Sequence, residues 1–139
     1  METGDVRRRL QHTIERAKRG AGERRARNDE GTRAFADFLD HVAVPLFKQI
    51  ANVLKIEGYP FTVFTPSGSV RLMSDKSADD YIEIALDTSD VEPRVMAHVS
   101  RGRGRRVVDD ERTIGKPETL SEEDLFAFLL KELEPFVER

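Results

Sequence analysis

The most chemically distinctive stretch of this sequence is a run of arginines interrupted by two glycines. It reads RGRGRR and holds four arginines within six positions, Arg101, Arg103, Arg105 and Arg106. Each guanidinium presents a planar fork of N–H donors that fits phosphate or carboxylate, and crowded cations repel one another unless an anion lies between them. The pattern therefore predicts an anion-binding hairpin tip.

Three kinds of anion remain open for this tip. The first is internal: the arginines would pair with Asp109, Asp110 and Glu111 on the following segment and leave a solvated hairpin. The second is an acidic protein, and the third is nucleic acid. An isoelectric point of about 5.7 and the lack of an aromatic residue beside the arginines, which could stack a base, count against nucleic acid.

The residues that usually carry catalysis form no recognisable pattern. His12, His41 and His98 lie outside metalloprotease spacing and outside any known order of serine, histidine and acid. The chain has no cysteine, so it has no thiol nucleophile and no disulfide. The sequence therefore favours a protein without catalysis of its own, and it predicts no cofactor and no metal. In the alternative, an enzyme, four polar residues on adjacent strands would share a concavity: Arg71, Tyr81, Glu83 and His98.

These residues need a framework, and its centre is a predicted helix over residues 31–57. Its apolar residues recur at helical spacing: Phe35, Phe38, Leu39, Val42, Leu46, Ile50, Val53 and Leu54. Pro45 lies inside this helix and predicts a kink or a break between His41 and Val44. A second amphipathic helix is predicted over residues 121–137, with Ser121 as its N-terminal cap and Asp124 completing a capping box.

Between the two helices the period of the apolar residues changes to two, which is typical of strands. Strands are predicted over residues 61–65, 69–74, 81–87, 94–100 and 105–114, with a glycine-rich turn over residues 101–104. Short connections favour an antiparallel meander. The predicted fold class is therefore α+β: a five-stranded antiparallel meander with both helices packed on one face.

The opposite face of this sheet is predicted to stay free of helices and to bind a partner. Its residues would be Phe64, Arg71, Met73, Tyr81, Met96 and His98, and four of these side chains are large and mostly apolar. We expect a second copy of the chain to cover this face; the alternatives are a ligand or foreign protein, or the chain's own N-terminal helix folded over it.

The N-terminal segment differs from the rest in charge. Residues 1–33 hold ten basic and six acidic residues, a net charge of +4, whereas residues 34–139 hold thirteen and twenty, a net charge of −7. Residues 5–19 predict a helix with a narrow apolar seam of Val6, Leu10, Ile14 and Ala17. That seam either faces water between i,i+4 ion pairs or pairs with another helix. A helix lying on a membrane surface is less favoured, because aromatic anchors are missing and acids interrupt the basic face. Gly20 and Gly22 predict a hinge or a solvated stretch after it.

Two regions follow from these patterns: a charged helical arm and hinge over residues 1–30, and a single α+β domain over residues 31–139. No stretch has the ~20 apolar residues that cross a bilayer, and we expect a soluble, cytoplasmic protein that does not bind membranes. The predicted function is a small binding or adaptor module that self-associates or binds another protein. The alternative is a nucleic-acid-associated protein that uses the basic arm and the RGRGRR tip.

Overall fold

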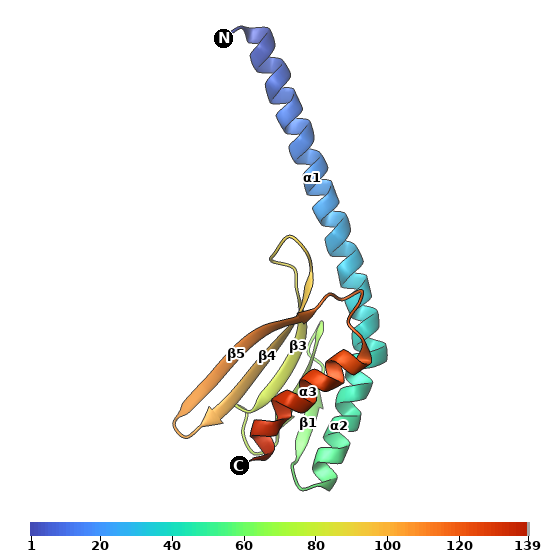
Figure 1. The fold of residues 1–139 in the computed structure, drawn as a ribbon, viewed down its shortest axis with the longest axis vertical. Coiled ribbons are helices and arrows are strands. Elements are labelled where there is room, and N and C mark those ends of the chain that lie inside the picture. The colour runs from blue at the N-terminus through green and yellow to red at the C-terminus, as the bar shows by residue number, and fades with distance from the viewer. Residues whose placement is uncertain (139) are drawn as a thin grey trace.

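The computed structural model describes residues 1–138 and has an α+β fold (Figure 1). A five-stranded antiparallel sheet has the order β1-β2-β3-β4-β5 and is open, with β1 and β5 at its edges. The strands are β1 (Phe61–Phe64), β2 (Ser69–Ser74), β3 (Tyr81–Asp87), β4 (Arg94–Arg103) and β5 (Arg106–Gly115). The C-terminal helix α3 spans Glu122–Val137. The predicted fold class and meander are confirmed.

The first two-fifths of the chain form one helical rod. It consists of α1 (Thr3–Phe38), a π-helical turn η1 (Leu39–Ala43) and α2 (Val44–Ile56). In the π-turn the amide of Val44 donates to the carbonyl of Leu39, five residues back. This wider turn changes which carbonyl faces the ring of Pro45, so the helix continues past the proline without a break. The helix is irregular close to Pro45, where a kink or a break was expected. The irregularity is a π-turn, which holds one residue more than an α-helical turn.

The stretch expected as a hinge or a solvated segment is solvated but helical. Residues 20–30 belong to α1, and none of them is buried. Glu23 lies four residues before Arg27, an order that stabilises a helix. Each of Gly20 and Gly22 costs about 1 kcal/mol in a helix, but extending an existing helix avoids the further cost of forming a new nucleus. The division of the chain at residue 30 stays a prediction, and the last residue of its second region, Arg139, lies outside the described residues.

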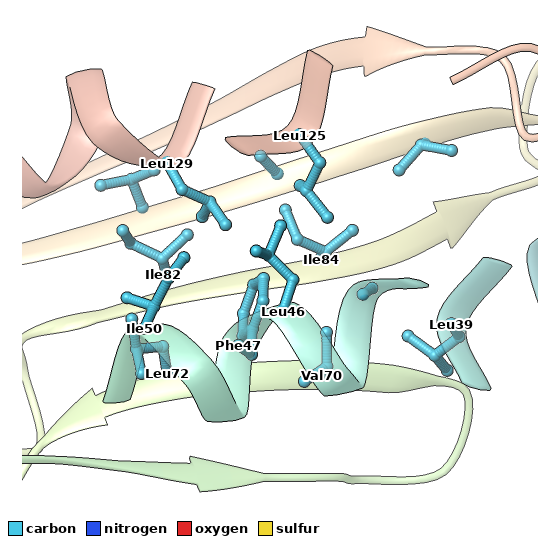
Figure 2. Close-up of a cluster of buried hydrophobic side chains, with 14 of the residues drawn as sticks. Leu39, Leu46, Phe47, Ile50, Val70, Leu72, Ile82, Ile84, Leu125 and Leu129 are labelled. Atoms are coloured by element: carbon cyan, nitrogen blue, oxygen red, sulfur yellow. The ribbon is translucent and has the colours of Figure 1, made fainter. Parts of the chain in front are cut away.

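The core lies between the sheet and the two helices α2 and α3 (Figure 2). One side of the sheet contributes fully buried residues: Val70, Leu72, Ile82, Ile84, Val95 and Ala97. Leu46, Phe47 and Ile50 of α2 meet them, and so do Leu125 and Leu129 of α3. The predicted capping box of Ser121 and Asp124 is present at the start of α3. Val53, which we assigned to the same stripe, is instead 57% exposed.

The long helix leaves the body at Gly31. A Cβ at this position would lie 2.6 Å from Cγ of Pro93, in the loop between β3 and β4, so glycine lets the helix and the loop touch. Gly31 is the first buried residue of α1. We call the exposed part of α1 before it, residues 3–30, the arm. At 1.5 Å per residue the arm is about 42 Å long, and it points away from the sheet (Figure 1).

Candidate interaction surfaces

The outer face of the sheet carries the six residues predicted to bind a partner. Strand alternation and register place Phe64, Arg71, Met73, Tyr81, Met96 and His98 on the side opposite the buried residues. They form three cross-strand rows. The middle row pairs Phe64 with Arg71, Arg71 with Glu83, Glu83 with His98, and His98 with Glu111. The structure therefore brings the predicted residues together on one face.

A connected set of polar contacts runs across this face. Arg71 Nη2 donates to Glu83 Oε2 over 3.1 Å, and its guanidinium lies 4.0 Å above the centre of the Tyr81 ring. Tyr81 packs edge-on against His98, with ring centres 5.3 Å apart. His98 Nε2 contacts the carboxylate of Asp109 on β5. Four adjacent strands are thus linked by side chains.

Two polar groups in this cluster are perturbed by their surroundings. Burial raises the pKa of Tyr81, and the charges of Asp109 and Glu83 add to the effect while Arg71 opposes it. Arg71 Nε is buried and has no hydrogen-bond partner among the described residues. The cluster therefore holds a neutral phenol and one unsatisfied donor on an open surface.

The charged middle row divides the apolar side chains of the outer face. On one side of the middle row Met73 lies opposite Tyr81, and on its other side Met96 lies opposite Ala85. Phe64, on edge strand β1, is 43% exposed. The middle row therefore separates Met96 from Met73 and Tyr81, a division that the types of the residues alone did not reveal.

The four polar residues of the enzyme alternative share a face, but they do not line one cavity. Glu83 lines a hollow of about 630 Å³ at the end of the sheet beside α1, together with Ser69 and Phe35. Arg71, Tyr81 and His98 do not line it. Among residues 1–138 no group of three or more histidines and acidic residues has a geometry that could hold a metal ion.

The arginine tip is a tighter hairpin than its sequence predicted. β4 continues to Arg103 and β5 begins at Arg106, so the turn is Gly104–Arg105 and not residues 101–104. Gly104 has a φ of +64°, as the first central residue of a type II′ turn requires. Gly102 lies within β4 and donates its N–H to Asp80. Two central residues suffice because such turns match the twist of the strands.

The arginines of this tip lie close to one another, and none of them forms an ion pair with another described residue. Arg103 lies directly opposite Arg106 across the strands, an unfavourable like-charge pair. Arg101 and Arg103 line a hollow of about 490 Å³ with Pro135 and Glu138 at the end of α3. Within the described part of the chain none of the four arginines forms an ion pair; Asp109 contacts His98, and Asp110 contacts Arg112. The internal pairing that we considered is therefore not formed.

The arm displays its apolar seam to solvent. Val6, Leu10 and Ile14 are 45%, 57% and 44% exposed. The arm does not fold back over the outer sheet face, because the continuous rod holds it away from the body (Figure 1). An exposed seam at helical spacing is typical of a helix that pairs with another element.

The structure also reveals an apolar groove that sequence reasoning missed. It lies between α2 and α3, has a volume of about 430 Å³, and is lined mainly by apolar side chains. Leu130 is 55% exposed there, and Glu122 and Glu123 lie beside it. The signal in the sequence was the breadth of the two apolar stripes. The two stripes are wider than one face of the sheet can cover, so Val53 and Leu130 remain outside the core.

Comparison of the chain with protein-family models, curated proteins and solved structures gave no match. Among the described residues no helix combines the length and apolar character needed to cross a membrane.

Proposed function

We propose that this chain is a self-associating α+β binding module, and that its helical arm is the element that joins the copies. The observation that carries the proposal is the exposed seam of Val6, Leu10 and Ile14 on a helix outside the body. A helix without tertiary contacts is marginally stable in water, since helices in proteins gain most of their stability from packing an apolar face. A partner helix or groove would supply that packing.

The arm is a better candidate for self-association than the outer sheet face, to which the sequence pattern assigns the interface. The charged row from Arg71 to His98 separates Met73 from Met96. Docking a second copy there would desolvate several charges, which costs free energy unless every charge gains a partner. Docking the seam of the arm would bury Val6, Leu10 and Ile14, none of which carries a charge that must be desolvated.

Removing residues 1–28 is expected to reduce the mass of the protein in solution to that of one chain. The full-length chain should show a mass above 15.8 kDa by light scattering after size exclusion. Leu10→Glu with Ile14→Glu should act like the truncation, because both changes place a charge in the seam. Arg8→Ala, on the other side of the arm, is the matched control and should leave the mass unchanged.

The same measurement separates the two candidate interfaces. Met73→Ser with Met96→Ser is expected to leave the mass of the full-length protein unchanged. If the two serine substitutions dissociate the protein and removal of residues 1–28 does not, the interface lies on the outer sheet face and not on the arm. A full-length chain that stays monomeric at all accessible concentrations would contradict self-association altogether.

One observation favours nucleic acid, or another polyanion, as a second candidate partner. Arg103 and Arg106 lie opposite each other and form no ion pair with another described residue, so bound phosphate would relieve their repulsion. Replacement of Arg101, Arg103, Arg105 and Arg106 by glutamine should abolish binding to a labelled oligonucleotide. Binding by the wild-type protein should fall steeply between 50 and 200 mM salt, because it releases counterions (a decade or more in affinity for several contacts). Binding that is insensitive to the substitutions and to salt would exclude the tip as a phosphate site.

A further inference from the structure

We propose that the arm of one copy docks in the groove between α2 and α3 of a second copy. This inference rests on the proposed function and names the surface that receives the arm. The groove is lined by ten residues: Leu46, Gln49, Ile50, Val53, Leu54, Glu122, Glu123, Phe126, Leu130 and Leu133. Seven of them are apolar, which suits an amphipathic helix laid into a groove.

The dimensions of the two surfaces agree. Val6 and Ile14 lie eight residues apart on the arm, with Leu10 midway between them. Leu46 and Leu54, which mark the extent of the groove along α2, also lie eight residues apart. Eight residues of α-helix span about 12 Å, so three side chains at steps of four can follow the groove from end to end.

The charges on the two surfaces are complementary. Successive residues of a helix are rotated by about 100°, and this places Arg7 and Lys18 beside the seam on one flank and Arg9 on the other. Asp5 and Glu15 fall on the opposite side of the helix, where Asp5 contacts Arg8. The groove has Glu122 and Glu123 at one end. A docked seam would therefore bring basic flanks to an acidic rim.

Net charge favours a contact between arm and body over a contact between two arms. Residues 1–33 carry +4 and the remainder −7, so two arms repel each other whereas an arm attracts the body of another copy. The arm cannot reach the groove of its own chain, because α1, η1 and α2 form one continuous rod that points the arm away from the body. The occupant is therefore the arm of a second copy, and a two-fold axis allows both arms to dock at once.

Two exposed groove residues provide the first test. Val53→Glu with Leu130→Glu places charge at positions that are 57% and 55% exposed, so the fold should tolerate both changes. The dissociation constant of the dimer, measured by sedimentation, is expected to rise at least ten-fold. Ile56→Glu is the matched control: Ile56 is 75% exposed on the same helix but lies outside the groove, and its replacement should change the constant little.

Cysteine cross-linking gives the second test, because the chain has no cysteine of its own. Leu10→Cys and Val53→Cys are made as separate proteins, mixed, and oxidised. The expected product is a disulfide-linked pair containing one chain of each, formed faster than the pair from Leu10→Cys and Ile56→Cys.

Each other outcome has a definite meaning. Efficient cross-linking of Leu10→Cys with itself, combined with a dimer unaffected by the groove substitutions, would overturn docking in the groove and leave arm-mediated association standing. A monomeric wild-type protein would overturn both the docking and the proposed function.

Discussion

Replacing Phe47 by alanine is expected to lower the free energy of unfolding by about 3–5 kcal/mol. Phe47 is fully buried and lies between α2 and the sheet, near Val70 and Leu72 (Figure 2). Truncation to alanine leaves a cavity that the surrounding strands fill only in part. A domain of this size has about 5–15 kcal/mol of stability in total, so the loss is a large share of it.

Urea unfolding followed by circular dichroism measures this effect. Val53→Ala is the matched control, since Val53 lies on the same helix but is 57% exposed. Both variants are compared in the chain shortened to residues 29–139. There Val53→Ala should lower the free energy of unfolding by well under 1 kcal/mol. Equal unfolding midpoints for the two variants would contradict the position assigned to Phe47 in the core.

Deletion of His41 is expected to destabilise the fold by several kcal/mol or to prevent folding. His41 is exposed and lies within the π-turn, which holds one residue more than an α-helical turn. Without it the turn would become α-helical, the ring of Pro45 would clash with a carbonyl one turn back, and α1 would rotate by about 100° relative to α2. Phe35 and Phe38, both buried, would leave the core.

Thermal unfolding of the deletion variant tests the role of the π-turn. His41→Ala is the control, with both variants made in the chain shortened to residues 29–139, because the substitution keeps the number of residues in the π-turn. A loss of about 1 kcal/mol shifts the melting temperature of a domain of this size by roughly 3 °C. If the His41 deletion melts within 2 °C of the control, the π-turn does not set the orientation of α1.

Local patterns were enough to predict the fold. Ile82, Ile84 and Leu86 recur at every second position, and Ser121 and Asp124 mark the start of a helix, so periodicity and caps located β3 and α3 correctly. In the arm, Gly20 and Gly22 indicated a hinge or a solvated stretch. The structure shows a solvated stretch, and its backbone stays helical because α1 continues through both glycines.

The candidate surfaces were predictable only in part. Alternation placed Met73, Tyr81 and Met96 on one face, but the charged row between them depends on the register of four strands. A sequence does not state that register directly. The groove depends on how α2 and α3 pack against each other, which is a tertiary feature. The sequence around Leu130 therefore did not indicate that this residue lines a groove.

The contact between Gly31 and Pro93 gives the arm the mechanics of a lever. Beyond this pivot the rod extends about 42 Å, so a tilt of only ~5° at Gly31 would displace the far end by about 4 Å. That distance is close to the width of a side chain. A substitution of Gly31 would therefore misalign Leu10 without touching it, so the direction of the arm depends on one glycine of α1 that packs against the loop holding Pro93.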